Sequence, residues 1–106
     1  LSKNLESGMN EIQPDELKNR IENGETLTIL DVREPWEYDE FNIGAKLYPL
    51  YKLPESLAQL ESLKNTEIIV HCQSGKRSNQ ARKYLSKHGF HKVRSLSGGL
   101  NAYCSN

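Results

Sequence analysis

The sequence predicts an α/β domain built on a mostly parallel sheet of four to five strands, with helices on both faces. Three apolar runs, residues 27–32, 67–71 and 93–96, alternate with segments whose apolar residues recur at helical spacing. The connections between them are short, which is typical of βαβ units. With 106 residues, the chain is long enough to bury a core without disulfide bonds.

The first half of the chain supplies the first of these units. A helix is predicted to begin at Pro14, since proline is tolerated in the first turn, and to end before Gly24. The strand over residues 27–32 follows. A short helix with Pro35 in its first turn and a short strand within residues 45–50 complete this half.

The second half repeats the alternation. Leucines within residues 53–63 step by four and three residues and predict one amphipathic helix. The strand over residues 67–71 leads into a loop at Cys72 and then into a helix that ends at Gly89. The strand over residues 93–96 and a short C-terminal helix close the pattern. We expect residues 1–10, which are polar, to form a flexible segment and residues 11–106 to form the domain.

The composition favours a cytoplasmic protein. No apolar run approaches the ~20 residues that cross a bilayer, and no signal-peptide core is present. The two cysteines, Cys72 and Cys104, make no disulfide framework, so we expect both to stay reduced. Cys104 has two interpretations: an incidental residue near the chain end, or a thiol that resolves an intermediate on Cys72.

The charges are unevenly distributed along the chain. All 14 acidic residues lie in residues 1–67, whereas residues 68–106 hold seven of the 14 basic residues and no acid. Either the two fields cancel on folding, or positive potential surrounds Cys72 and attracts anions. A net charge of zero, without a run of five basic residues, argues against nucleic-acid binding.

Cys72 is the candidate catalytic residue. It follows a buried strand, at the sheet edge where open α/β folds bind ligands. Backbone N–H groups of a turn that enters a helix form an anion-binding concavity, and Gly75 permits the backbone geometry such a turn needs. Lys76 and Arg77 add positive charge. Together these features are expected to lower the pKa of the Cys72 thiol from its usual ~8.5.

No histidine is placed to shuttle protons for this cysteine. His71 is adjacent, but neighbouring strand residues point to opposite faces, and the other two histidines lie at the far end of the next helix. The site therefore suits attack by a thiolate on a sulfur atom whose leaving group departs as a stable anion.

Four motifs occur in the order and spacing of a known family. They are residues 30–38 (Leu-Asp-Val-Arg-Glu-Pro-Trp-Glu-Tyr), residues 69–78 (Ile-Val-His-Cys-Gln-Ser-Gly-Lys-Arg-Ser), Gly89-Phe90 with Val93, and residues 96–102 (Leu-Ser-Gly-Gly-Leu-Asn-Ala). By these motifs the sequence resembles the single-domain rhodaneses, which are sulfurtransferases, over residues 12–103. The resemblance implies a rhodanese-like fold and a reaction that needs neither a metal nor a cofactor.

The resemblance also implies a mechanism of the thiosulfate sulfurtransferase kind. Cys72 takes the outer sulfur of a small anionic donor such as thiosulfate and becomes a persulfide. It then passes that sulfur to cyanide in vitro, or to a thiol or sulfur-carrier protein in the cell. Asp31, Arg33 and Ser78 are implied to support the loop from behind, although Asp31 and Arg33 could equally form an ion pair that only locks a turn. By the same resemblance, the loop expected to bind substrate and persulfide comprises Gln73, Ser74, Gly75, Lys76 and Arg77.

Three alternatives accompany this interpretation. Related cysteine phosphatases and arsenate reductases place five residues between Cys and Arg, whereas this chain has four. A catalytically slow binding or regulatory module is the second. Third, residues 41–45 (Phe-Asn-Ile-Gly-Ala) resemble rhodanese domains fused behind adenylating enzymes of molybdopterin and thiamine biosynthesis, so the chain could be the C-terminal domain of such a protein, with a carrier protein as its acceptor.

Overall fold

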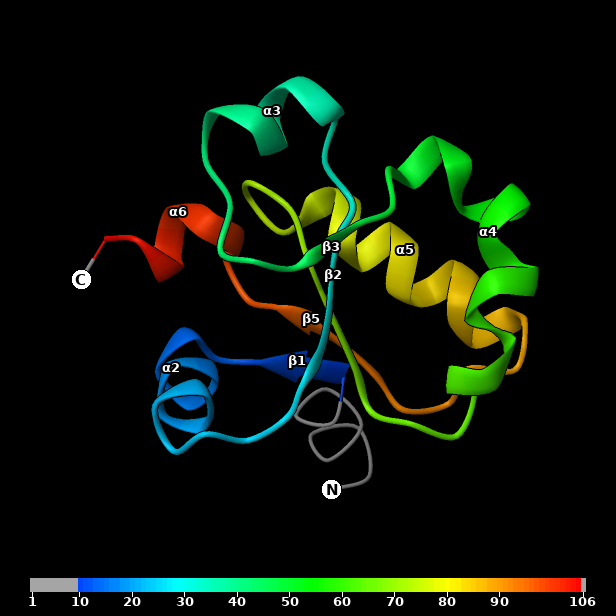
Figure 1. Ribbon diagram of the computed structural model, residues 1–106, viewed down its shortest axis with the longest axis horizontal. Helices are drawn as coiled ribbons and strands as arrows, with labels where there is room; N and C mark the ends of the chain where they lie inside the picture. The colour runs from blue at the N-terminus through cyan, green and yellow to red at the C-terminus, as the bar shows by residue number, and fades with distance from the viewer. Residues whose placement is uncertain (1–9, 106) are drawn as a thin grey trace.

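The computed structural model describes residues 10–105 and contains a five-stranded sheet flanked by helices (Figure 1). The strands are β1 (Glu11–Ile12), β2 (Thr28–Asp31), β3 (Lys46–Leu47), β4 (Ile68–His71) and β5 (Val93–Leu96). The α-helices are α2 (Pro14–Glu22), α3 (Pro35–Glu40), α4 (Leu53–Leu60), α5 (Lys76–Lys87) and α6 (Gly99–Tyr103), and two 3-10 turns, η1 (Leu50–Lys52) and η2 (Glu61–Leu63), flank α4.

The sheet confirms the predicted fold class. Its strand order is β1-β5-β4-β2-β3, and every neighbouring pair is parallel. The longest pairing joins β2 to β4, with Asp31 opposite His71 at its carboxyl end. This end of the two central strands is where the loop at Cys72 begins, as the sequence predicted.

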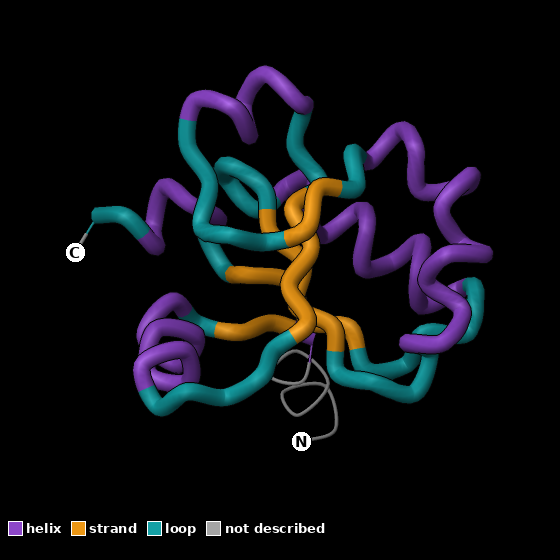
Figure 2. Tube along the Cα trace, viewed as in Figure 1, coloured by secondary structure: helices purple, strands orange, loops and turns teal. Residues whose placement is uncertain are grey.

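Helices cover both faces of the sheet, with strands running between them in Figure 2. On one face, α4 and α5 pack their apolar side chains against Leu30, Ile68 and Val70. On the other, α2 contributes Leu17 to a smaller cluster with Ile69 and other strand residues. Because strand side chains alternate, β4 sends Val70 toward α4 and α5 and sends Ile69 toward α2 and α6.

Most predicted elements appear near their expected bounds, with two differences. The leucine-rich segment over residues 53–63 is not one helix, because α4 ends at Leu60 and the last three residues form a 3-10 turn. Strand β1 was not predicted, since two residues carry no measurable alternation; its pairing with β5 defines it.

Two further predictions concern the N-terminal segment and membrane-spanning helices. The predicted flexible segment, residues 1–10, lies outside the described part of the chain except for Asn10. Among residues 10–105, no helix has the length and apolar character to cross a membrane.

Candidate active site

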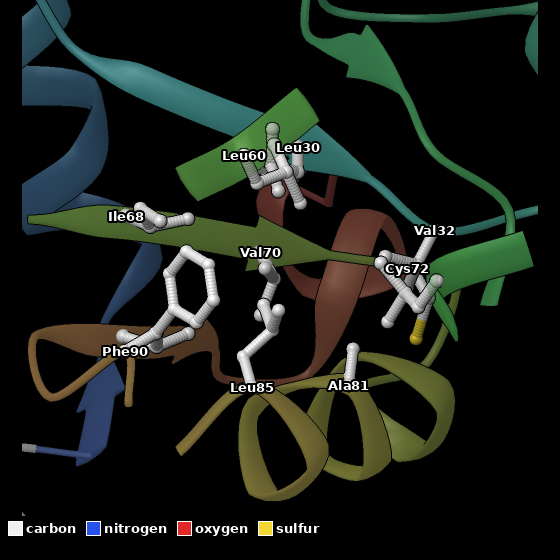
Figure 3. Close-up of a cluster of buried hydrophobic side chains, with 11 residues drawn as sticks. Leu30, Val32, Leu60, Ile68, Val70, Cys72, Ala81, Leu85 and Phe90 are labelled. Carbon is white, nitrogen blue, oxygen red and sulfur yellow. The ribbon is translucent and has the colours of Figure 1, made fainter. Parts of the chain in front are cut away.

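Cys72 lies between the carboxyl end of β4 and the start of α5, at one end of the larger core cluster. Figure 3 shows its sulfur beside Val32 and near Ala81. The side chain has no exposed surface in this structure. The sulfur is therefore held in a mostly apolar setting, where only nearby polar groups can stabilise a negative charge.

Three groups of the loop and of α5 point at the Cys72 sulfur. The backbone N–H of Gly75 donates to Sγ at 3.1 Å, and that of Ser78 donates at 3.3 Å. The Ser78 hydroxyl oxygen lies 3.5 Å from Sγ. Gly75 has a φ of +103°, a left-handed conformation that strains other residues, and this turn directs its N–H inward.

These contacts decide the acidity of the thiol. Burial raises the pKa of Cys72, but hydrogen bonds from the Ser78 side chain and from the backbone of Ser78, Gly75 and Ser74 outweigh it, so the pKa is lowered overall. The direction agrees with the sequence prediction. Of the causes that the sequence predicted, the backbone N–H donors are among those that lower the pKa most, together with the Ser78 hydroxyl, ahead of the charges of Lys76 and Arg77.

A second serine supports the first. The Ser95 hydroxyl on β5 lies 2.7 Å from the Ser78 hydroxyl, and both residues are buried. Ser78 also donates to the Gly75 carbonyl at 3.2 Å. Because a hydroxyl has one proton, a hydrogen bond donated by Ser95 to Ser78 leaves the Ser78 proton free for the Gly75 carbonyl or for a Cys72 thiolate.

The start of α6 clamps the loop from the opposite side. The backbone N–H of Leu100 donates to the Cys72 carbonyl at 3.0 Å, and that of Asn101 donates to the Gln73 carbonyl at 2.9 Å. A Cβ at Gly99 would lie 2.5 Å from the Gln73 carbonyl oxygen. With their carbonyls held by α6, these peptides keep a fixed orientation, and the loop N–H groups that follow turn toward the sulfur.

Asp31 and Arg33 form a buried ion pair behind the loop. Arg33 Nη2 donates to an Asp31 carboxylate oxygen at 2.8 Å, and Arg33 Nε donates to both oxygens at 3.0 and 3.1 Å. Arg33 Nη1 also reaches the Gln73 side chain at 3.2 Å, and Nη2 reaches the Phe41 carbonyl at 2.6 Å. The pair thus locks the turn after β2 and also contacts the loop that carries Cys72.

His71 does not face the sulfur. It is buried, its Nε2 lies 3.6 Å from an Asp31 oxygen, and that nitrogen has no hydrogen-bond partner. Burial lowers the pKa of His71, which keeps the ring neutral near pH 7. The placement agrees with the sequence prediction that this histidine is structural.

Arg77 is held by a residue from a distant part of the chain. Its guanidinium donates to the two carboxylate oxygens of Glu37, on α3, at 2.6 and 2.9 Å. The Arg77 side chain is 33% exposed and that of Glu37 12%. The hydrogen bond from Arg77 is the main reason that the pKa of Glu37 falls to about 2, so the pair is ionised at neutral pH.

A hollow of about 350 Å³ lies on the α3 side of the loop. Trp36 and Phe41 border it and are 62% and 51% exposed. Its other lining residues are Arg33, Glu37, Glu40 and Gln73. It offers aromatic surface to a small organic group directly beside the Cys72 loop.

Comparison with known families shows to which family this chain belongs. A model of the family described as the rhodanese-like domain matches residues 13–106. The chain belongs to the rhodanese-like domain family. This confirms the resemblance found in the sequence motifs.

Individual relatives agree. The chain is 31% identical over 96 residues to a sulfurtransferase of Allochromatium vinosum, covering 90% of this chain and 88% of that protein. It is 36% identical over 95 residues to a probable adenylyltransferase/sulfurtransferase, MoeZ, of Mycobacterium tuberculosis, covering 87% of this chain but 24% of MoeZ. The crystal structure of a rhodanese-like domain protein from Staphylococcus aureus superposes with a TM-score of 0.81 at 32% identity, covering 90% and 91% of the two chains.

The rhodanese-like domain brings the predicted loop residues around the sulfur mainly through their backbone. Gly75 and Ser78 contact Sγ directly, Gln73 connects Arg33 to Asn101, and Lys76 and Ser74 are exposed. No role for Glu37, Ser95 or the start of α6 was predicted from the sequence. Glu37 and Gly99 lie within the family motifs, which could have indicated them; no local signal indicates Ser95.

Proposed function

We propose that this rhodanese-like domain is a sulfurtransferase that carries sulfane sulfur on Cys72 as a persulfide. The observation that carries the proposal is the set of N–H donors from Gly75 and Ser78 on a buried sulfur. Such donors stabilise negative charge on a thiolate, and they suit the anionic persulfide equally well. Sulfurtransferase relatives at modest identity support the same role.

The reaction proceeds in two displacements. The Cys72 thiolate attacks the outer sulfur of a donor such as thiosulfate or an organic persulfide. The donor's S–S bond breaks, and sulfite or a thiolate departs with the bonding electrons. An acceptor thiolate, or cyanide in vitro, then attacks the terminal sulfur of the persulfide and restores the Cys72 thiolate. Neither step needs a general base, which agrees with the absence of a histidine facing the sulfur among the described residues.

The acceptor in the cell is proposed to be a thiol or a sulfur-carrier protein. Relatives named as a putative sulfur carrier protein and as an adenylyltransferase/sulfurtransferase support the second of these. A cysteine that must stay reduced between turnovers fits the cytoplasmic location that the sequence predicts.

Two observations disfavour a phosphatase. Four residues separate Cys72 from Arg77, whereas the related phosphatases have five. The loop is therefore shorter than the loop that binds a phosphoryl group in those enzymes. In addition, the guanidinium that would bind phosphate is occupied by Glu37.

Intact-mass measurement tests the proposal against the alternative of a binding module. Incubation with thiosulfate or an organic persulfide should add one sulfur atom to the protein, and a following thiol or cyanide should remove it. The Cys72→Ser variant should gain no sulfur, whereas Cys104→Ser, at an exposed position, should gain it as the unmodified protein does. A protein that takes up no sulfur from any donor would indicate a binding module.

A further inference from the structure

The two arginines nearest the Cys72 loop are both engaged within the protein. Arg77 is held by Glu37 through two short hydrogen bonds. Arg33 is buried and directs its N–H groups to the Asp31 carboxylate, the Phe41 carbonyl and the Gln73 side chain. A substrate that arrives at the loop therefore meets neither guanidinium as an unpaired cation.

The charge balance at the loop is consequently close to neutral. Each arginine is matched by one carboxylate, which leaves the exposed Lys76 as the loop's unmatched positive charge. On the α3 side, the carboxylate of Glu40 adds one negative charge that offsets it. Thiosulfate carries two negative charges, and Arg77 could bind it only by leaving Glu37. An incoming dianion would also lie close to the Glu37 carboxylate, which is ionised because its pKa is about 2.

The hollow beside the loop suits a different kind of donor. Trp36 and Phe41 expose aromatic surface there, and its volume of about 350 Å³ is within the range of small-molecule sites. The hollow meets the Cys72 loop at Gln73, so the body of a small organic persulfide that rests on these rings would lie next to that loop.

On the basis of the function proposed above, we infer that the donor that loads Cys72 is a small organic persulfide in preference to thiosulfate, and that Glu37 sets this preference by occupying Arg77. In the loading step the Cys72 thiolate attacks the terminal sulfur of R–S–SH. The S–S bond of the donor breaks, R–S⁻ leaves with the bonding electrons, and the product on the enzyme is Cys72–S–SH. Sulfite, a dianion, does not have to be accommodated as a leaving group.

The experiment compares loading of Cys72 by thiosulfate and by the persulfide of 2-mercaptoethanol, whose body is uncharged. The unmodified protein should load faster from the persulfide at equal concentration. Glu37→Gln should raise kcat/KM for thiosulfate relative to the persulfide by about fivefold, the equivalent of the ~1 kcal/mol of a partly exposed ion pair. Asp39→Asn removes one charge from an exposed position on the same helix and should leave this ratio within about twofold.

A double variant tests whether the effect acts through Arg77. Glu37→Gln combined with Arg77→Gln should lose the gain with thiosulfate, because no guanidinium is then released to bind the anion. A gain that persists in the double variant, or an equal gain in Asp39→Asn, would overturn the role assigned to Glu37.

Salt dependence provides a measurement that does not depend on a variant's folding. For the unmodified protein, kcat/KM for thiosulfate should stay level or rise with added salt, because the charges around the loop nearly cancel and both arginines are paired. A steep fall with salt, or preference for thiosulfate over the persulfide, would overturn the inference while leaving the sulfurtransferase proposal intact. A protein that loads sulfur from neither donor would instead refute the proposed function itself.

Discussion

The Ser95 hydroxyl lies 2.7 Å from the Ser78 hydroxyl, and Ser78 in turn contacts the Cys72 sulfur. A residue of β5 that does not touch the sulfur thereby orients one that does. The pair connects the sheet to the reactive group through two buried hydroxyls.

This relationship predicts a graded effect on the acidity of Cys72. Ser78→Ala should raise the pKa of the thiol, because the variant removes the side-chain hydrogen bond that does most to lower it. Ser95→Ala should raise it by less, since it acts only by freeing Ser78 to reorient. The pH dependence of thiolate absorbance, measured in a Cys104→Ser background, checks both. Ser86→Ala, at an exposed position of α5, serves as the control and should leave the titration unchanged.

Gly99 is expected to tolerate no side chain. In Gly99→Ala the new Cβ would lie 2.5 Å from the Gln73 carbonyl oxygen and 2.7 Å from that of Cys72, so the loop must shift. Gly24 also has a positive φ, but nothing lies within 4 Å of a Cβ there. Gly24→Ala should therefore cost only the backbone strain of about 1 kcal/mol. Gly99→Ala should lower the free energy of unfolding, measured in urea, by more than this, and should also slow persulfide formation. Equal losses of stability at the two sites would contradict the close contact between the start of α6 and the Cys72 loop.

The buried ion pair between Asp31 and Arg33 should be sensitive to the loss of one partner. Arg33→Met leaves an uncompensated carboxylate in the interior and is expected to lower the free energy of unfolding by about 3 kcal/mol or more. Glu61→Gln removes one side of the exposed Lys64–Glu61 pair and should change stability by less than about 0.5 kcal/mol. Chemical denaturation of the two variants makes the comparison. Similar small effects would mean that Asp31 finds solvent or another partner.

The Glu37–Arg77 pair should give stability a defined pH dependence. The folded state lowers the pKa of Glu37 from 4.5 to about 2, so the native protein binds fewer protons than the unfolded chain in this range. The stabilisation is complete above pH 4.5 and is lost as the pH falls toward 2. The difference in unfolding free energy between the unmodified protein and Glu37→Gln should therefore be constant near neutral pH and shrink below pH 4.5. A difference that does not change with pH would contradict the ion pair.

The two cysteines should differ in reactivity according to reagent size. Cys72 has a lowered pKa but is buried, whereas Cys104 is exposed. A bulky aromatic disulfide reagent should label Cys104 first, and small sulfur donors should load Cys72. Peptide mapping by mass spectrometry after brief labelling distinguishes the two sites. Rapid labelling of Cys72 by the bulky reagent would show that the loop opens readily in solution.

Local patterns in the sequence predicted most of the fold. Helix α2 begins at Pro14, and the three predicted apolar runs form strands β2, β4 and β5. Cys72 follows β4, as expected. These features depend on residues close together in the chain, where periodicity and turn chemistry are informative. The two-residue strand β1 was missed because its pairing with the distant strand β5 defines it. The end of α4 at Leu60 was missed because the leucine spacing continues unchanged into the 3-10 turn η2.

By itself, the sequence determined that a thiol would stand at the carboxyl end of a parallel strand, inside a turn with Gly75 that leads into a helix. The tertiary structure decided what surrounds that thiol. Glu37 reaches Arg77 across 40 residues of chain, Ser95 reaches Ser78 across 17, and Gln73 meets Asn101 across 28. The strand order places these segments side by side. No local pattern encodes that order, so whether Arg77 is an open anion site or an occupied one could be learned only from the folded chain.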